Sequence, residues 1–264
     1  MKAEVKTSPY AGERIAKVIA RAGVCSRRDA ERLIEEGRVA LNGKVVTSPA
    51  VNVGEGDAIA IDGKPLPLKE PTRLWRYHKP EGLVVSHKDP QERRSVFDAL
   101  SDRLPRVVSI GRLDINTEGL LLLTNDGELA RLLELPATGW VRRYRVRAFG
   151  RPDPEALARL KDGITIEGVH YGPIEARIDK EQGANTWLTF AIREGKNREV
   201  KRVCDHLGLT VNRLIRTSFG PFQLGELKPG EIDEVPARVI ADQTGLKIAR
   251  GSDDPDHRRK PQRS

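Results

Sequence analysis

Apolar residues recur at helical spacing near the start of the chain. In ERIAKVIARAG, Ile15 and Ile19 fall on one helical face, and Gly23 ends the pattern. Ser26 is a typical N-cap for a second helix, RRDAERLIEEG, which ends at Gly37. The pattern therefore predicts two short helices that follow one another.

Strand signals come directly after these helices. In RVALNGKVV the Asn42-Gly43 pair predicts a tight hairpin, and VGEGDAIAIDG alternates with the period of two that is typical of a strand. The first part of the chain is therefore a small unit of two helices followed by strands.

A change of composition separates this unit from a longer region rich in strand signals. Three prolines and a glycine in DGKPLPLKEPT interrupt the apolar pattern and predict a linker. Beyond it, strand character is found in RLWRYHKP, GLVVSH, GLLLLTNDG, RRYRVRAFG, ITIEG, TWLTFAI and NRLIRTSFG. Helical character is found in GELARLLEL, PEALARLKDG and KNREVKRVCDHLG. Strands and helices without regular alternation favour an α+β fold.

These signals divide the chain into four parts. We expect a small domain over residues 12–62, a linker over 63–72, a larger domain over 73–245 and a basic tail over 246–264. The tail contains ARGSDDPDHRRKPQRS, which offers few apolar residues to bury, so we expect it to be disordered.

Charge and composition narrow the classes of function. The 264 residues include 46 Lys and Arg against 38 Asp and Glu, a net charge of +8, which suits a nucleic-acid partner. No apolar run approaches the roughly 18 residues of a membrane span, and the N-terminus lacks the apolar stretch of a secretory signal. We therefore expect a cytoplasmic protein with no membrane partner. Cys25 and Cys204 show no metal-ligand spacing, so we expect neither a metal site nor a disulfide.

Basic residues are concentrated in the two predicted helices. They include Arg14, Lys17, Arg21, Arg27, Arg28 and Arg32. The first three recur at i, i+3 and i+7, which predicts a stripe opposite the apolar face of the first helix. Such a stripe can follow a phosphate backbone. A solvated helix face with acidic neighbours is the alternative interpretation.

The same segment resembles a known RNA-binding module. The string RIAKVIARAGVCSRRDAERLIEEGRVALNGKVV is similar to an S4 domain, a small fold found in a ribosomal protein and in several RNA-modifying enzymes. SRR, LIEEGRV and LNG occur in the usual order and spacing, with Leu41 where Val is common. The resemblance implies that the basic residues of the two helices contact RNA.

One carboxylate stands out in the second region. Asp114 lies in GRLDINTEGLLLLTNDG, shortly before four consecutive leucines. An acid on a loop that leads into a buried strand is held at the edge of a low-dielectric core. Taken alone, the pattern is more typical of a loop cap than of a catalytic acid.

The surrounding motifs resemble those of the ribosomal pseudouridine synthases, a family with small-subunit and large-subunit enzymes. GRLD followed by TEGLLLLTNDG is similar to the catalytic motif of the family, and HKP is similar to its opening strand. Tyr144 in RRYRV matches the active-site tyrosine, with Arg142 where Lys is frequent. Lys201 in EGKNREVKRV matches the basic residue of the family, and Leu214 in NRLIR matches a packing position beside the pocket. The resemblance extends from residue 13 to about residue 236.

The resemblance implies a fold and a reaction. The fold is an S4 domain followed by a mixed, mainly antiparallel sheet flanked by helices. The reaction is an isomerisation of uridine to pseudouridine that uses no cofactor. Asp114 is then the nucleophile or the base, Lys201 its ion-pair partner, and Tyr144 a residue that stacks on the uracil or takes its C5 proton.

The target base has to leave its stack, which costs a few kcal/mol. The resemblance implies that Arg112 fills the gap left by the extruded base, and a phosphate contact or an ion pair is the alternative. Arg198 belongs to a basic cluster in residues 193–216 that we expect to contact the RNA backbone.

We therefore expect an rRNA pseudouridine synthase that modifies one uridine of 23S rRNA. The motifs EGKNREVKR and NRLIRTSFGPFQLGELKPGE favour the large-subunit members of the family. The same reaction on 16S rRNA is the first alternative, and a non-catalytic S4-type ribosome-assembly factor is the second. We expect a monomer whose partner is ribosomal RNA or a subunit assembly intermediate.

Overall fold

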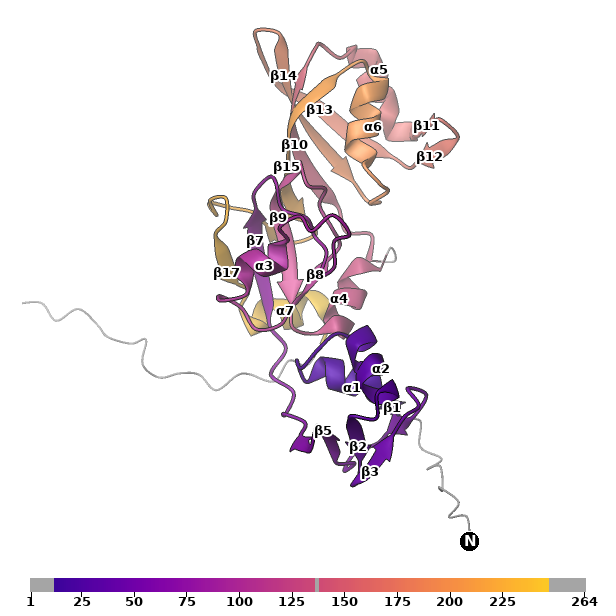
Figure 1. The fold of residues 1–264 in the computed structure, drawn as a ribbon. Helices are drawn as coiled ribbons and strands as arrows, with labels where there is room; N and C mark the ends of the chain where they lie inside the picture. The colour runs from indigo at the N-terminus through magenta and orange to yellow at the C-terminus, as the bar shows by residue number, and fades with distance from the viewer. Residues whose placement is uncertain (1–11, 136–137, 247–264) are drawn as a thin grey trace, which may run out of the picture. The chain divides into compact units, whose positions relative to one another are not determined.

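The computed structural model describes residues 12–135 and 138–246. The chain forms two compact units that divide between Pro71 and Thr72, and each is drawn in Figure 1. In the described ranges, no helix has the length and apolar character needed to cross a membrane. The tail for which we predict disorder lies outside the described residues, apart from Leu246.

The small unit combines two short helices with two small antiparallel sheets. Its elements are β1 (Glu13–Arg14), α1 (Ile15–Arg21), α2 (Arg27–Glu35), β2 (Val39–Leu41), β3 (Lys44–Val46), β4 (Asn52–Val53), β5 (Ile59–Ile61) and β6 (Lys64–Pro65). The strand orders are β3-β2-β5-β6 and β1-β4. Ile19 of α1, Ile34 of α2 and Val39 of β2 are fully buried and meet in one core.

Local signals in the sequence determine where these elements begin and turn. The hydroxyl of Ser26 accepts a hydrogen bond of 3.1 Å from the backbone N–H of Asp29, and so caps α2 as predicted. Asn42 and Gly43 have φ values of 51° and 77° between β2 and β3, as a tight two-residue hairpin requires. The start of the predicted linker contributes β6, which pairs with β5.

The large unit is built on a nine-stranded sheet. Its strands are β7 (Leu74–Lys79), β8 (Val108–Ile110), β9 (Glu118–Thr124), β10 (Arg142–Phe149), β13 (Ile174–Gln182), β14 (Asn185–Ile192), β15 (Thr210–Phe219), β16 (Phe222–Gln223) and β17 (Ile232–Glu234). The order is β13-β14-β10-β15-β9-β7-β17, with β8 on β9 and β16 on β15. The pairing of β9 with β15 is parallel and the other named pairings of this sheet are antiparallel. The mixed, mainly antiparallel sheet is confirmed.

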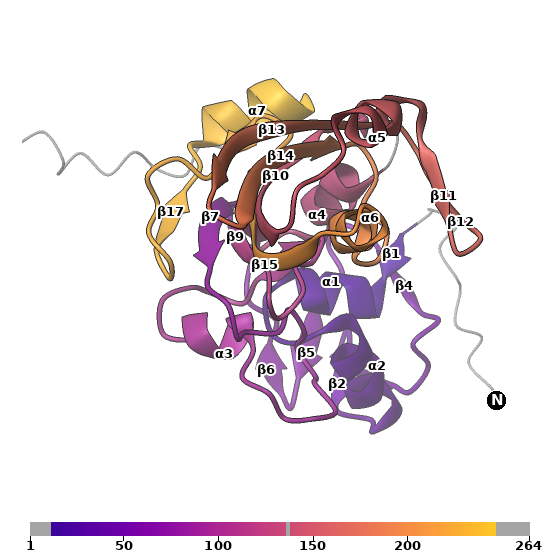
Figure 2. The same cartoon turned by 90° about the horizontal axis from the view of Figure 1, so that it is seen from above.

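Helices cover both faces of this sheet. They are α3 (Val96–Leu100), α4 (Gly127–Glu134), α5 (Pro154–Arg159), the 3-10 turn η2 (Leu160–Asp162), α6 (Glu199–His206) and α7 (Ala237–Thr244), and a hairpin of β11 (Ile164–Ile166) and β12 (Val169–Tyr171) lies beside them. In Figure 2, β13, β14 and β10 follow a curved course with α5 and α6 on its inner side.

The leucines of β9 supply both cores because neighbouring strand residues point to opposite faces. Leu121 and Leu123 belong to the larger core, to which α3, α5 and α6 contribute. Leu120 and Leu122 belong to a second core with α4 and α7. β9 is thus buried on both faces, which makes it a rigid support for the loop that precedes it.

Some predicted elements differ from the structure. GLVVSH forms no strand, since Val84 makes only an isolated bridge to Ser95: an apolar run indicates burial without specifying the backbone. β13 was missed because IEARIDKEQ is mostly polar, as suits an edge strand that pairs only with β14. The helix predicted over KNREVKRVCDHLG begins only at Glu199, because Arg198 adopts a left-handed backbone with φ of 52°.

Candidate active site

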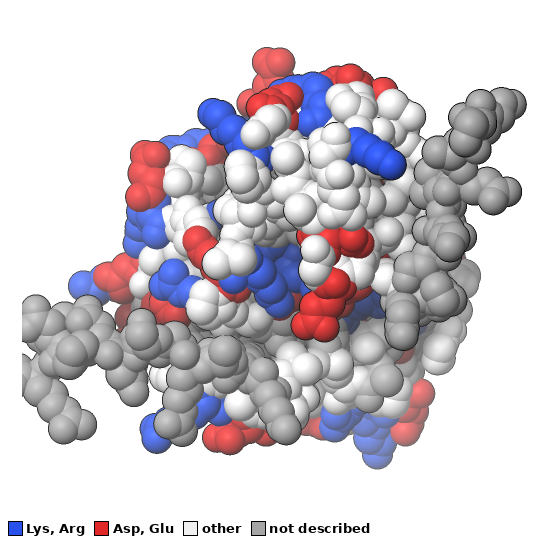
Figure 3. Space-filling model, turned by 90° about the horizontal axis from the view of Figure 1, so that it is seen from below, with Lys and Arg blue, Asp and Glu red and all other residues white. Residues whose placement is uncertain are grey.

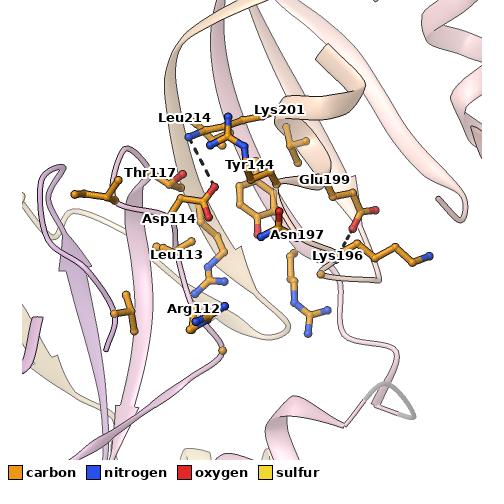
Figure 4. A pocket seen from close by; sticks show the side chains of 18 of the residues that line it. Arg112, Leu113, Asp114, Thr117, Tyr144, Lys196, Asn197, Glu199, Lys201 and Leu214 are labelled. Carbon is orange, nitrogen blue, oxygen red and sulfur yellow. Dashed lines mark hydrogen bonds and ion pairs between the residues drawn. The ribbon is translucent and has the colours of Figure 1, made fainter. Parts of the chain in front are cut away.

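A cleft of about 1440 Å³ opens in the large unit. Its walls come from the loop between β8 and β9, from β10 and β15, and from the segment that leads into α6. Among its lining residues are Arg112, Asp114, Tyr144, Arg198, Lys201 and Leu214. The structure therefore brings together, in one place, all the residues that the resemblance assigned to this domain (Figure 4).

Asp114 lies in the loop between β8 and β9. The backbone N–H of Thr117 donates a hydrogen bond of 3.0 Å to the carbonyl oxygen of Asp114, which closes a turn directly before β9. The side chain of Asp114 keeps 34% of its surface exposed. The carboxylate is therefore held on a rigid element and stays open to a ligand.

Lys201 approaches Asp114 from α6. Its Nζ lies 3.8 Å from Oδ2 of Asp114, and the lysine side chain is only 10% exposed. Burial lowers the pKa of the Lys201 amine, while the negative charge of Asp114 acts in the opposite direction. The contact is long for an ion pair, so it supplies a positive field without occupying the carboxylate oxygens.

A second lysine holds the Asp114 loop from within the protein. Lys79, the last residue of β7, is fully buried and donates to the carbonyls of Pro80, Ile115 and Thr117 at 3.0, 3.3 and 2.9 Å. Burial lowers the pKa of this amine to about 8. HKP was expected in the opening strand, but no role was predicted for Lys79, because an apolar pattern does not reveal a buried cation.

An ion pair between Glu118 and Arg213 connects β9 to β15. Glu118 accepts two hydrogen bonds from Arg213, from Nε at 2.7 Å and from Nη2 at 2.9 Å. The Glu118 side chain is 9% exposed, and the Arg213 hydrogen bonds lower the pKa of its carboxyl. This bidentate pair was not predicted either.

The glycine of the TEG motif permits the close approach of these two strands. Gly119 has φ of 104°, and a Cβ atom added there would lie 2.3 Å from the carbonyl oxygen of Arg216. A larger residue would push β15 away from β9. The glycine therefore fixes the distance between the Asp114 loop and the strand that carries Leu214.

Tyr144 and Leu214 form an apolar wall of the cleft. Tyr144 on β10 is 9% exposed, and Leu214 on β15 is 4% exposed. Strand alternation turns Arg143 and Arg145 to the other face of β10. Figure 4 shows the Tyr144 ring between Asp114 on one side and Asn197 on the other. A planar base can stack on such a surface.

The segment before α6 carries further polar residues to the cleft. The carboxylate of Glu199 accepts a hydrogen bond of 2.9 Å from the backbone N–H of Lys196, which closes a loop around Asn197 and Arg198. Glu199 is buried, and burial raises the pKa of its carboxyl. Glu199 is the first residue of α6, and no sequence signal pointed to this contact of its side chain.

Two arginines at the cleft are exposed and have no carboxylate partner in the described ranges. Arg112 precedes Asp114 by two residues, and Arg198 precedes α6. Both guanidinium groups are therefore available to a negatively charged ligand.

The basic residues of the small unit fall into two groups. Lys17 and Arg21 both pair with Glu13, the former at 2.8 Å, and Arg32 pairs with Asp29 at 3.3 Å. On the face shown in Figure 3, basic and acidic side chains are likewise intermixed.

Arg14, Arg27 and Arg28 are exposed and form no ion pair with any residue that the structure describes. The helical stripe predicted for Arg14, Lys17 and Arg21 is wrong at its first member. Arg14 belongs to β1, where pairing with Asn52 of β4 keeps its backbone extended, and the helix begins at the next residue.

The two cysteines lie in different units, Cys25 against the core of the small unit and Cys204 in the large unit. Cys204 is fully buried in the larger core, where burial raises the pKa of its thiol to about 12. In the part of the chain that the structure describes, no group of three or more His, Cys, Asp or Glu side chains is arranged to hold a metal ion.

Comparisons with known proteins extend over both units. The family model described as RNA pseudouridylate synthase matches residues 73–206, and the S4 domain model matches residues 13–59. A Rickettsia bellii protein named "Uncharacterized RNA pseudouridine synthase" is 49% identical over 227 residues, which cover 86% of this chain and 98% of that protein.

A relative with a more specific name and a solved structure are also similar to this chain. "Ribosomal large subunit pseudouridine synthase B" of Pasteurella multocida is 42% identical over 260 residues, or 93% of this chain and 74% of that protein. A crystal structure of a pseudouridylate synthase has a TM-score of 0.60 and 27% identity, and it covers 88% of this chain and 100% of that chain.

Proposed function

The chain belongs to the RNA pseudouridylate synthase family, and from this premise we propose that it converts one uridine of 23S rRNA to pseudouridine. It is an enzyme with an S4 RNA-binding domain in front of its synthase domain. The observation that supports a large-subunit substrate is the 42% identity to a large-subunit synthase B over 93% of this chain. We propose that a monomer acts in the cytoplasm on this RNA or on a subunit assembly intermediate.

The isomerisation rearranges two bonds of the nucleoside. The C1′–N1 bond breaks, the uracil turns, and C1′ joins C5. The hydrogen on C5 leaves as a proton, and N1 gains a proton, so that no atom is added or lost overall. The enzyme has to stabilise charge at C1′ and at the base while the uracil is detached.

We assign the reactive carboxylate to Asp114, as nucleophile at C1′ or as base. What supports this is the convergence of Asp114, Tyr144 and Lys201 in one cleft, with the Asp114 oxygens free of short hydrogen bonds in the described structure. Lys201 places a positive charge 3.8 Å from the carboxylate. Tyr144 and Leu214 hold the uracil ring by stacking and apolar contact.

The remaining cationic residues bind RNA in this proposal. Arg112 enters the space that the extruded base leaves, and Arg198 contacts the backbone near the cleft. In the S4 domain the contacts come from Arg14, Lys17, Arg21, Arg27, Arg28 and Arg32. Since phosphate contacts position an RNA without reading its sequence, the choice of uridine depends on the shape of the whole RNA.

Carbodiimide-based mapping of pseudouridine in all rRNA tests this function. Cells that lack the gene are compared with cells that express the wild type or Asp114→Asn. We expect one large-subunit site to disappear and to return only with the wild type.

The same map decides between the alternatives. A missing small-subunit site would keep the reaction and change the substrate to 16S rRNA. A map without any missing site would contradict an rRNA substrate and would favour a non-catalytic S4-type assembly factor.

A further inference from the structure

Two arginines lie over one aromatic ring that lines the cleft. The guanidinium carbon of Arg142 lies 4.6 Å from the centroid of the Phe219 ring, and that of Arg216 lies 5.3 Å from it. All three residues line the cleft together with Tyr144. Two positive charges are therefore held close to the surface on which the base stacks.

Arg216 has fewer partners than its burial requires. It is only 2% exposed, and its Nε donates to the carbonyl of Leu120 at 2.7 Å. Its Nη2 is buried and has no hydrogen-bond partner among the described residues. A buried donor without a hydrogen bond carries a desolvation penalty, and the penalty is larger when the donor belongs to a charged group. This nitrogen therefore marks a place where a hydrogen-bond acceptor is needed.

Arg142 is also without a counterion. Its Nη1 donates to two carbonyls, those of Trp140 at 3.2 Å and Arg193 at 2.8 Å. Within the described part of the chain, neither Arg142 nor Arg216 forms an ion pair with a carboxylate. Carbonyl oxygens satisfy hydrogen bonds but neutralise no charge.

The two acids whose charges act on Arg142 make their hydrogen bonds to the backbone elsewhere. The carboxylate of Glu199 accepts from the backbone N–H of Lys196, and that of Glu134 accepts from the backbone N–H of Gly111 at 2.6 Å. Burial lowers the pKa of Arg142 and the charge of Arg216 lowers it further, while Tyr144 and the two acids act in the opposite direction. Like charges in a partly desolvated site gain most from a bound anion.

We propose that Arg142 and Arg216 form a subsite for a backbone phosphate of the extruded nucleotide. A guanidinium fork matches two phosphate oxygens, which a single lysine amine does not. Arg216 lies opposite Tyr144 in the β10–β15 pairing, and Arg142 precedes Tyr144 by two residues on β10. A base stacked on Tyr144 therefore brings its own phosphates toward this pair. The assignment rests on the proposed function.

The subsite contributes to binding more than to the chemical step. A phosphate next to the target base remains the same group before and after the isomerisation, so its contacts stabilise substrate and transition state alike. Their binding energy offsets the cost of taking the base out of its stack.

A chemical double-mutant cycle tests the proposal. The probe is an rRNA fragment around the uridine found by mapping, in which either phosphate flanking that uridine is replaced by an uncharged methylphosphonate. Dissociation constants are measured for Arg142→Gln and for the matched control Arg143→Gln, which removes the same charge from the opposite face of β10. All proteins carry Asp114→Asn to prevent turnover.

Methylphosphonate at one of the two flanking phosphates should weaken RNA binding about tenfold or more when Arg142 is present, as expected for a charge-assisted hydrogen bond. The same replacement should have no effect with Arg142→Gln and the full effect with Arg143→Gln. Equal effects in both variants would overturn the subsite. An effect of Arg142→Gln on the single-turnover rate of otherwise wild-type enzyme, without one on binding, would also overturn it and would indicate contact with the uracil.

A second measurement applies if Arg142→Gln does not fold. The Tm of the wild type should rise with millimolar inorganic phosphate and not with chloride at equal ionic strength. No difference between the two salts would contradict the subsite. A wild type that forms no pseudouridine would refute the proposed function instead, and the Tm measurement would still decide the subsite.

Discussion

Two acids of the large unit, Asp114 and Glu118, lie four positions apart in the chain, and each pairs with a basic residue. The two pairs differ in geometry. Glu118 and Arg213 make two hydrogen bonds of 2.7 and 2.9 Å, and the acid is 9% exposed. Asp114 and Lys201 make one contact of 3.8 Å, and here the acid is 34% exposed and the lysine 10% exposed. The first pair buries a satisfied carboxylate, while the second keeps a carboxylate free beside a buried cation.

This difference in geometry suits the two carboxylates to different roles, one structural and one chemical. A carboxylate whose oxygens are taken by an arginine fork has little capacity left for a substrate. A carboxylate that has a positive charge nearby, but no short hydrogen bond from it, keeps its oxygens accessible to a ligand. The Glu118 pair together with Lys79 therefore positions the loop, and in the proposed function Asp114 is the group that meets the substrate.

The largest expected effect is on turnover by Asp114→Asn. We expect a loss of at least about 10² to 10⁴ in single-turnover rate, because the substitution removes the charge that acts on the nucleoside. Thermal unfolding should stay close to that of the wild type, since among the described residues the Asp114 side chain has only the 3.8 Å contact to lose. An unfolding temperature that falls as strongly as the rate would contradict the division between the two pairs.

Lys79 should make the stability of the protein depend on pH. Its pKa is about 8 in the folded protein against 10.5 for an ordinary lysine, so the unfolded chain binds more protons between these values. The free energy of unfolding should therefore rise from pH 8 to pH 10.5, by at most about 3 kcal/mol. Urea unfolding of the wild type and Lys79→Met across this range measures it. The slopes of the two proteins should differ, and parallel slopes would argue against the lowered pKa.

Glu118→Gln should affect folding before chemistry. We expect a loss of about 1.5–3 kcal/mol in the free energy of unfolding at neutral pH, the range for hydrogen bonds to charged groups. The pKa of Glu118 in the folded protein lies below 4.5, the ordinary value of a glutamate carboxyl. Its contribution is thus complete above pH 4.5 and is lost as the pH falls through the folded-state value. Denaturation curves of the wild type and Glu118→Gln, measured above pH 4.5 and below the folded-state pKa, check this prediction. A difference in the free energy of unfolding that stays the same in acid would contradict it.

The smallest expected effect concerns the S4 domain. Arg28→Gln should weaken RNA binding and reduce the slope of log Kd against log salt concentration by about one ion. Lys17→Gln should change both quantities less, because Lys17 already pairs with Glu13 at 2.8 Å. Titrations at several salt concentrations compare the two variants directly. Equal slopes would show that the ion pair does not restrict Lys17.

Local and motif-based features of the molecule could be predicted from the sequence. Ser26 as a cap and Asn42-Gly43 as a hairpin depend on neighbours in the chain, so the sequence was sufficient. The convergence of Asp114, Tyr144 and Lys201 could be anticipated because their motifs resemble those of a family, although spacing alone did not require it.

What the sequence did not indicate depends on tertiary contacts. Lys79 and Arg216 occur in strands whose polar residues usually face solvent, yet both are buried where other segments close over them. The Glu118–Arg213 pair joins two strands that are far apart in the chain. Such groups are recognised only when their hydrogen bonds and their burial are known together.

Release of tritium from rRNA labelled at uridine C5 tests most directly whether Asp114 drives the isomerisation. The hydrogen on C5 leaves only when C1′ is transferred to that carbon, so the released count follows the reaction itself. We expect purified wild-type protein to release tritium and Asp114→Asn to release it at least about 10²-fold more slowly, with RNA binding retained. Release by Asp114→Asn at the wild-type rate would contradict the account.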